Sequence, residues 1–219
     1  MPQKPVRVFL IRKNIALAAG ALLAAVAIFC AVNVPAAITA AGNARQLPIY
    51  CVDRSGEDGK KYCAISFDAA WGNEDTQMLI DILAKYDVKA TFFLVGSQIE
   101  GRDDVVRRIR QEGHQIGSHS FSHRALTELS TADALADLEK CDRALRQVLV
   151  DGSYWLRPPY GFLSDRELCA LGTPAICWSV DTEDWKSRDV DSILDIVLRR
   201  AGDGDILLLH DCCRNRFPF

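Results

Sequence analysis

The feature that most constrains this chain is a repeated alternation of short apolar segments with longer segments of helical periodicity, which starts at Tyr62. Strands are predicted at residues 62–67, 89–95, 114–117, 154–156, 175–180 and 205–209. Helices are predicted between them, through 73–86, 105–109, 130–145 and 193–198, because apolar side chains recur there at helical spacing. Strands that alternate with helices predict an α/β fold with a parallel sheet, either a barrel or a doubly wound sheet.

The sequence also predicts two helix N-termini and the apolar faces of two helices. Asn73 is a predicted N-cap, and Ser130 with Asp133 resembles a capping box. The predicted apolar faces consist of Met78, Leu79, Ile82, Leu83 and Tyr86 in the first helix and of Ile193, Leu194, Val197 and Leu198 in the last.

Chemically reactive side chains collect directly after the predicted strands. In chain order they are Asp68, His119, His123, Arg157, Asp181, Asp184 and His210. In parallel α/β folds the carboxyl ends of the strands form the active face, so these side chains should converge on one site.

Two of these residues, His119 and His123, are four positions apart, which places both imidazoles on one side of a helical turn and within reach of a single cation. For an isolated pair, two solvated or capping histidines are an equally good interpretation. His114 is interpreted as a hydrogen-bonded structural histidine. Asp68 follows an apolar strand, and the permanently charged Arg157 can pair with it. Taken alone, Asp68 can also be explained as a turn or cap residue. Its position among the other reactive side chains is what indicates a site.

Composition excludes several classes of protein. The chain has 219 residues, of which 49% are hydrophobic, so it is long and apolar enough for one sizeable folded domain. Its 26 Lys and Arg against 29 Asp and Glu give a net charge of −3, and no long basic run occurs beyond the first thirteen residues. Binding to nucleic acid is therefore not predicted, and no protein partner is predicted either.

The N-terminal segment has the pattern of a membrane-insertion signal. Basic residues up to Lys13 precede an uncharged apolar run of eighteen residues, 15–32. The basic flank should stay in the cytoplasm and the remainder should cross the membrane. Small residues at 35–41 also allow cleavage, so the chain is either held in the cell membrane by one N-terminal helix or secreted. The predicted organisation is residues 1–42 as flank and membrane segment, 43–61 as linker and 62–219 as the domain.

The chain has eight cysteines, of which Cys30 lies in the apolar run. Seven remain beyond it, and an odd number leaves at least one thiol without a partner in the same chain. Most are interpreted as small core residues or incidental thiols.

Six motifs in residues 62–211 closely resemble those of the NodB-homology polysaccharide deacetylases, carbohydrate esterase family four. They occupy 66–72, 90–96, 113–123, 157–161, 181–185 and 208–211, in the order and spacing of the family. Trp71 gives the first motif an aromatic residue, in which it resembles the sporulation-associated branch of the family. The resemblance implies a distorted (β/α) barrel of the polysaccharide deacetylase type. It also implies metal-dependent hydrolysis of N-acetyl groups on cell-wall amino-sugar polymers, with peptidoglycan as the expected acetylated glycan and acetate as product.

The resemblance also implies roles for particular residues. His119 and His123 would hold a divalent metal, usually zinc in the family. Asp68 would be the general base, oriented by Arg157. The other implied roles are proton donation to the departing amine by His210, orientation of His210 by Asp184, an oxyanion contact from the backbone N–H of Tyr160, and lining of the acetyl pocket by Trp185 and Leu209.

Ala69 departs from the family pattern, because the family carries there an aspartate that is the third metal ligand. The ion is then held by the two histidines with water or another carboxylate such as Asp68 or Asp75, or it binds weakly, or the site is inactive. A catalytically inactive glycan-binding or assembly module is therefore the alternative function.

A third interpretation, from another class of enzyme, is glycoside hydrolysis by Asp68 paired with Asp181 or Asp184. The family also continues for longer than the eight residues that follow Asp211, which favours a truncated C-terminal end.

Overall fold

The structure is a computed structural model that describes residues 47–53, 59–69, 74–149, 154–171, 174–186 and 189–211. All of these belong to one unit, Gln46–Phe219. The predicted membrane segment, the predicted cap at Asn73 and the chain after Asp211 lie outside the described residues. Among the helices of the described ranges, none combines the length and apolar composition needed to cross a membrane.

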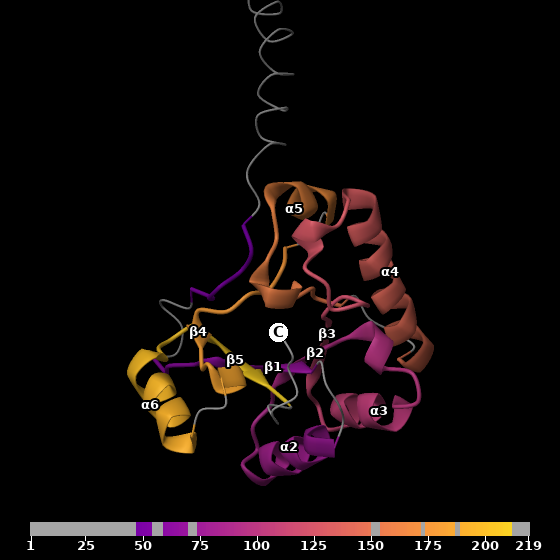
Figure 1. Ribbon diagram of the computed structural model, residues 1–219. Coiled ribbons are helices and arrows are strands. Elements are labelled where there is room, and N and C mark those ends of the chain that lie inside the picture. The colour runs from indigo at the N-terminus through magenta and orange to yellow at the C-terminus, as the bar shows by residue number, and fades with distance from the viewer. Residues whose placement is uncertain are drawn as a thin grey trace, which may run out of the picture. The chain divides into compact units, whose positions relative to one another are not determined.

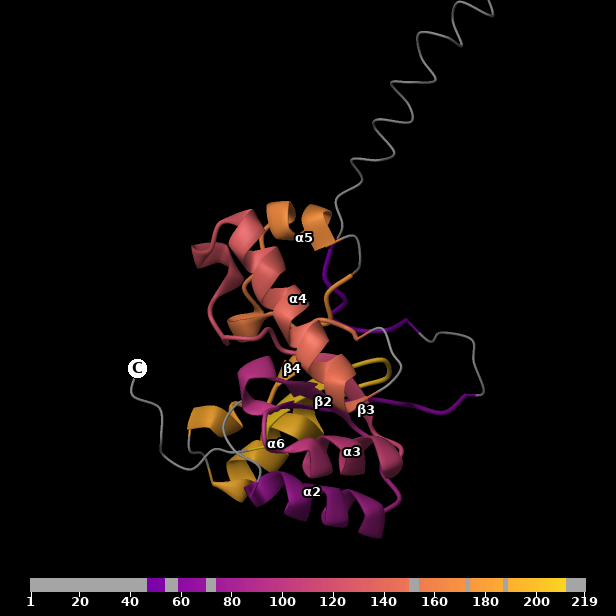
Figure 2. The ribbon, with the colours of Figure 1, turned by 90° about the vertical axis from the view of Figure 1, so that its right-hand side faces the viewer.

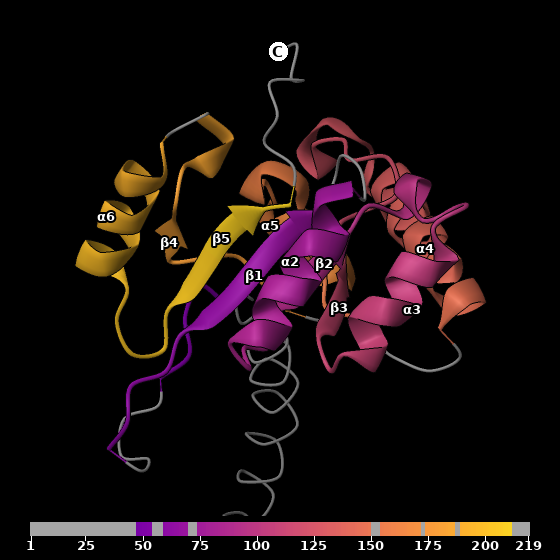
Figure 3. The same cartoon turned by 90° about the horizontal axis from the view of Figure 1, so that it is seen from below.

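A central sheet of five parallel strands confirms the predicted α/β fold, with the spatial order β3-β2-β1-β5-β4. The strands are β1 (Ala64–Ala69), β2 (Thr91–Leu94), β3 (Gln115–Ser118), β4 (Val180–Asp181) and β5 (Ile206–His210). The α-helices are α2 (Glu74–Lys85), α3 (Asp103–Gln111), α4 (Thr131–Val148), α5 (Asp165–Leu171) and α6 (Val190–Arg200). Figure 3 shows β5 and β1 side by side, with α2 and α6 outside the sheet. Each helix returns the chain to the edge where the next parallel strand begins.

Isolated parallel bridges continue the pairing beyond β3, first from Ser118 to Leu156 and then from Leu156 to Ala175. The segment after Ala175 runs into β4, which pairs with β5. The pairings therefore return to the sheet in which they began, with the helices around them (Figure 1), as expected of a distorted barrel. The predicted strand at 154–156 contributes only a bridge, because Pro158 and its neighbour Pro159 lack the N–H groups that continued pairing would need.

Part of the predicted linker 43–61 is paired with the domain. The N–H of Ile49 donates to the carbonyl of Ala175 over 2.7 Å, and the N–H of Cys177 donates to the carbonyl of Ile49 over 2.8 Å. The N–H of Val52 donates to the carbonyl of Gly204 over 2.8 Å. We call residues 47–52 the N-terminal strap. The prediction of a linker is wrong for the strap, because backbone groups of the strap are hydrogen-bonded to the domain.

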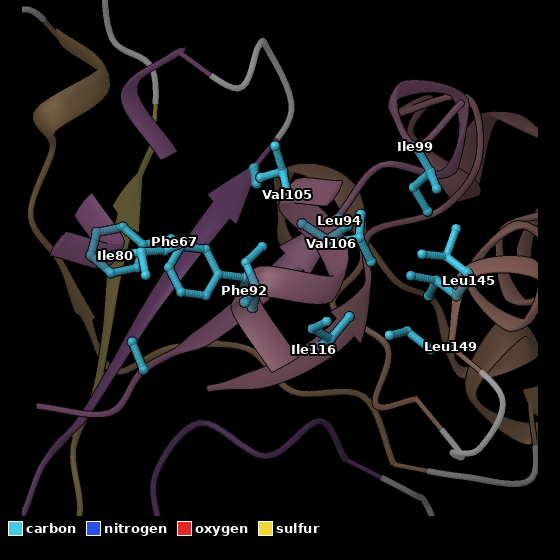
Figure 4. Packing of buried hydrophobic residues seen from close by; sticks show 14 of the residues in the cluster. Phe67, Ile80, Phe92, Leu94, Ile99, Val105, Val106, Ile116, Leu145 and Leu149 are labelled. Carbon is cyan, nitrogen blue, oxygen red and sulfur yellow. The ribbon is translucent and has the colours of Figure 1, made fainter. Parts of the chain in front are cut away.

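The main hydrophobic cluster lies between the sheet and the helices α2, α3 and α4 (Figure 4). The Phe67 and Phe92 rings stack with their centroids 5.2 Å apart. Around them pack Ile80, Val105, Val106, Ile109, Ile116 and Leu145. Figure 2 shows α2 and α3 running beside one another on this side of the sheet. This packing stabilises β1 and β2 and thus the strand ends that carry the reactive groups.

The rotation of two helices differs from the prediction. On α2, Met78 and Ile82 are 53% and 46% exposed, whereas Thr76, Ile80 and Leu83 are buried. The predicted face is therefore wrong for Met78, Ile82 and Tyr86 on or after α2 and for Leu194 and Leu198 on α6, which are all exposed. On α6 the buried residue is Ile196, which packs against Val180 and Leu207. The buried face of each helix is thus narrower than the distribution of its apolar residues indicates.

The predicted N-cap of α4 is confirmed, because the Ser130 hydroxyl accepts a hydrogen bond from the N–H of Asp133 over 3.1 Å. Of the cysteines that the structure describes, Cys141 and Cys177 are buried, Cys51, Cys63 and Cys169 are exposed, and all are free thiols. Burial raises the pKa of the Cys141 thiol to about 11, so this residue behaves as a small core side chain, as predicted.

Candidate active site

Asp68 and Arg157 form a buried ion pair at the carboxyl end of β1. Nη1 of Arg157 donates to Oδ1 of Asp68 over 3.0 Å, and the arginine has no exposed surface. Nε and Nη2 donate to the carbonyls of Ile176 and Cys177 over 3.3 and 3.1 Å. The guanidinium lies 4.1 Å from the centre of the Phe93 ring. The predicted pair is therefore present, and its arginine is fixed on all sides.

Ser66 is a site residue that the sequence reasoning missed. Its hydroxyl accepts a hydrogen bond from Nη1 of Arg157 over 2.8 Å and donates one to the carbonyl of Leu207 over 2.6 Å. Ser66 lies two residues before Asp68 in β1, so both side chains share one face of the strand. This two-residue alternation is the signal that would have found it.

His119 is held in one tautomer by the backbone. Its Nδ1 lies 2.8 Å from the carbonyl oxygen of Arg157, which can only accept, so Nδ1 carries the proton. Nε2 is the other ring nitrogen, and it faces Oδ2 of Asp68 at 3.4 Å. Burial lowers the pKa of His119, although the charge of Asp68 acts in the opposite direction. His119 is thus held between the Arg157 carbonyl on one ring nitrogen and the Asp68 carboxylate near the other.

His123 lies beside His119, with ring centroids 5.0 Å apart and planes at 60°. The helical turn predicted for this pair is wrong, because Ser120 and His123 have φ of 63° and 56° and the chain forms an irregular turn. Asp137 on α4 holds that turn by accepting from the N–H groups of Phe121 and Ser122. The two rings nevertheless meet as the spacing predicted. Burial and the neighbouring His119 lower the pKa of His123 to about 4.

His210 and Asp184 form a second, partly buried pair on the neighbouring strand end. Oδ1 of Asp184 lies 2.8 Å from Nδ1 of His210, and Oδ2 accepts from its backbone N–H over 2.7 Å. Burial by itself would lower the pKa of His210, but the hydrogen bond and charge of Asp184 outweigh it and raise the pKa. Asp184 also accepts from the N–H of Trp185 over 2.9 Å. The predicted orientation of His210 by Asp184 is therefore present.

Leu209 is not brought together with these residues. It packs against the hydrophobic clusters that contain Phe67 and Val180. Because alternate residues of a strand point to opposite faces, Leu208 and not Leu209 shares the face of His210. Leu208 is 3% exposed, and Trp185 is half-buried.

Tyr160 is held beside His123 in a left-handed conformation. Its hydroxyl lies 3.4 Å from Nδ1 of His123, and their ring centroids are 5.1 Å apart. Its φ is 60°, which is uncommon for a residue other than glycine and tends to mark functional sites.

Other candidate residues have structural roles. His114 is buried and accepts from the N–H of Ala90 over 3.2 Å, which confirms it as a structural histidine. Asp181 accepts from the N–H of Glu183 over 2.8 Å and thereby stabilises its own loop. Asp184 is hydrogen-bonded to His210, so both carboxylates considered as partners of Asp68 for glycoside hydrolysis have other contacts.

The arrangement around His119 suits a cation. Nε2 of His119 and Oδ2 of Asp68 face each other at 3.4 Å, and the second imidazole of His123 lies alongside. Neutral imidazoles are the form that binds zinc and similar ions. Among the described residues no group of three His, Cys, Asp or Glu side chains gathers to hold a metal. Ala69 is buried at the strand end, and Asp75 lies in the first turn of α2. His119 and His123 are therefore the two imidazoles that could hold an ion, and the described residues gather no third ligand with them.

Comparison with known proteins gives related sequences and structures. The model of the polysaccharide deacetylase family matches residues 55–172. Peptidoglycan-N-acetylglucosamine deacetylase PgdA of Listeria monocytogenes is 39% identical over 151 residues, which are 69% of this chain and 32% of that protein. The chain thus spans about a third of the length of this curated relative.

Similar solved structures include the following three. That of peptidoglycan deacetylase PdaC from Bacillus subtilis has a TM-score of 0.68 at 35% identity, covering 71% of this chain and 77% of that one. That of a CE4 family pseudoenzyme from Bacillus anthracis has a TM-score of 0.69 at 32% identity, covering 76% and 59%. A mutant of the latter with restored enzymatic activity has a TM-score of 0.70 at 33% identity, covering 76% and 61%.

Proposed function

Because the chain belongs to the polysaccharide deacetylase family, we propose that it hydrolyses N-acetyl groups on cell-wall amino-sugar polymers, with peptidoglycan as the substrate. The reaction consumes water and yields acetate and a free amine on the sugar. The related deacetylases PgdA and PdaC are named for peptidoglycan, which supports this substrate class.

One observation carries the proposal: a carboxylate paired with an arginine and an imidazole paired with a carboxylate lie in register on two adjacent strand ends. Asp68 is ion-paired with Arg157 and has an oxygen 3.4 Å from Nε2 of His119. On the adjacent strand β5, paired in register with Asp68, His210 has a raised pKa through Asp184. Amide hydrolysis needs both partners, because water must lose a proton and the departing amine must gain one.

In the first step Asp68 takes the proton of the attacking water while the new carbon–oxygen bond forms. Arg157 binds the other oxygen of Asp68 and keeps the carboxylate oriented towards that water. Ser66 and the carbonyls of Ile176 and Cys177 hold the arginine, so the base does not depend on solvent for its position.

In the second step His210 gives its proton to the nitrogen as the carbon–nitrogen bond breaks. Asp184 fixes Nδ1, so Nε2 is the nitrogen that delivers the proton. The N–H of Tyr160 is the proposed donor to the oxyanion. Trp185 is the proposed wall of the acetyl pocket, together with Leu208, which takes the place of Leu209 because it shares the face of His210.

His119 and His123 would hold the divalent metal, for which we propose zinc. Such an ion supplies polarisation of the acetamide carbonyl and lowers the pKa of a bound water. The Nδ1–H of His119 donates to the Arg157 carbonyl, which leaves Nε2 as the nitrogen that would bind the ion.

Acetate release from acetylated glycan strands tests the proposal. Activity should rise with added zinc or cobalt, fall with a chelator, and drop by about 100-fold or more in Asp68→Asn, the effect of losing a general base. Asp81→Asn is the matched control, because Asp81 is an exposed carboxylate on α2 that pairs with Arg108. Absence of acetate release from every acetylated glycan, with metal supplied, would contradict the proposal.

A second candidate function, a catalytically inactive glycan-binding module, is favoured by Ala69 and by the similarity to a pseudoenzyme. The discriminating variant is Ala69→Asp, with Ala69→Asn as a control of nearly the same size without the charge. If Ala69→Asp releases acetate where the natural chain and Ala69→Asn do not, the natural chain is a binding module. Activity of the natural chain excludes this alternative.

We also propose that the domain acts outside the cytoplasmic membrane, either anchored or secreted. The support is the basic flank and the apolar run at 15–32. Fractionation of cells that express the full chain, with protease added from outside, tests this. A chain that stays protected in the cytosol would refute it.

A further inference from the structure

Four aromatic rings form a row that leads from the buried centre of the site to the surface. The ring centroids are 5.0 Å apart between His119 and His123, 5.1 Å between His123 and Tyr160, and 6.1 Å between Tyr160 and Phe162. Along this row the exposed fraction rises from 1% at His119 to 53% at Tyr160 and 57% at Phe162. The last ring has no role in the chemistry described above.

A rigid turn displays the two outer rings. Tyr160 and Gly161 have consecutive left-handed φ angles of 60° and 69°. A Cβ at Gly161 would lie 2.8 Å from the Trp178 ring, so the turn packs tightly on that indole. The N–H groups of Gly161 and Phe162 donate to the carbonyls of the two preceding prolines over 3.1 and 3.2 Å. Because the backbone is held in this way, binding to the rings would cost little loop ordering.

Exposure alone does not distinguish Phe162. Tyr50, Tyr86 and Trp155 are also about half exposed or more, and single exposed aromatic residues are ordinary on protein surfaces. Phe162 differs because its ring continues a row that begins at the proposed reaction centre. A ring in that position meets whatever is covalently attached to the reacting group.

We propose that Phe162 is the stacking platform for the sugar ring next to the one being deacetylated, and hence that the enzyme favours oligomers over single sugars. The inference rests on the proposed function, because it takes the occupant of the row to be the same glycan. A pyranose ring has an apolar face of C–H groups that is complementary to an uncharged aromatic face. Tyr160 would contact the reacting sugar and Phe162 its neighbour.

Glycan binding tests the inference without turnover. The probes are the β-1,4-linked tetramer of N-acetylglucosamine and the monomer, titrated calorimetrically into the full chain with a chelator present. Phe162→Ala should weaken tetramer binding about fivefold, which corresponds to about 1 kcal/mol, and change monomer binding by less than about twofold. Phe162→Trp should retain tetramer binding.

Tyr86→Ala is the matched control, because Tyr86 is 67% exposed and follows α2 at the edge of the sheet opposite the site. It should bind both probes like the natural chain. In the active enzyme Phe162→Ala should raise KM for the tetramer about fivefold and leave kcat unchanged, as expected when uniform binding is lost.

Three results would overturn the inference: unchanged tetramer binding in Phe162→Ala, equal weakening for monomer and tetramer, or no tetramer binding by the natural chain. Equal weakening would mean that Phe162 acts by shaping the turn of Tyr160. If Phe162→Ala selectively weakens tetramer binding while the natural chain releases no acetate, the deacetylase proposal fails and the glycan platform stands.

Discussion

Exchanging Asp211 for asparagine should stabilise the protein at neutral pH and not at acidic pH. Asp211 directly follows β5 and is only 5% exposed. The Thr76 hydroxyl donates to its Oδ2 over 2.6 Å, whereas Oδ1 has no hydrogen-bond partner within the described ranges. A buried carboxylate with one oxygen unpaired is costly to ionise.

The magnitude follows from the pKa. Burial raises the pKa of Asp211 from 3.8 to about 6, against the hydrogen bond from Thr76, which acts in the opposite direction. The rise of the pKa from 3.8 to about 6 corresponds to about 3 kcal/mol of folding free energy. The folded state holds its proton more tightly than the unfolded state, so this stabilisation is complete below pH 3.8 and is lost as the pH rises through about 6. Asparagine cannot ionise and escapes that loss.

The assay is urea unfolding of both proteins at several pH values between 4 and 8. The free energy of unfolding of Asp211→Asn, relative to the natural chain, should increase by up to about 3 kcal/mol across this range. Asp81→Asn, on the exposed surface of α2, should show no such trend. A difference between Asp211→Asn and the natural chain that stays constant with pH would refute the reasoning.

Three further variants test local features by urea unfolding. Ser130→Ala removes the N-cap of α4 and should cost about 1 kcal/mol; an unchanged midpoint would contradict the cap. Gly161→Ala combines a left-handed φ with a clash against Trp178 and should cost about 1–3 kcal/mol; an unchanged midpoint would contradict the strain. Ser66→Ala leaves a buried arginine N–H without its hydroxyl acceptor and should cost about 1–3 kcal/mol and lower kcat; full activity would show that the hydroxyl is dispensable.

Much of the site could be predicted because its residues are placed by the parallel sheet itself. Asp68 and His210 lie at the carboxyl ends of β1 and β5, and Arg157 follows the bridge at Leu156. Parallel strands bring their carboxyl ends together whatever the details of the loops. The contact between His119 and His123 was predicted for a helix and arises in an irregular turn. Their spacing of four residues brings the rings together in either backbone conformation.

The features that could not be predicted depend on tertiary contacts. The helix α5 has only seven residues and was not predicted, since so short a segment carries little periodic signal. The exposed Leu194 and Leu198 of α6 look like core residues in the sequence, and only packing on Val180 and Leu207 selects Ile196. Leu209 faces the hydrophobic clusters and not the site, because alternate residues of β5 point to opposite sides of the sheet.

The N-terminal strap has a practical consequence for anyone who trims this chain. The family match starts at residue 55, after the strap ends. Yet Ile49 exchanges two backbone hydrogen bonds with the segment of Ala175 and Cys177, and the Cys177 carbonyl binds Nη2 of Arg157. A recombinant fragment cut at the family boundary would therefore lose the hydrogen bonds that support the segment contacting Arg157, and low activity in such a fragment would reflect the cut. Fragments intended for enzymology should begin before residue 47.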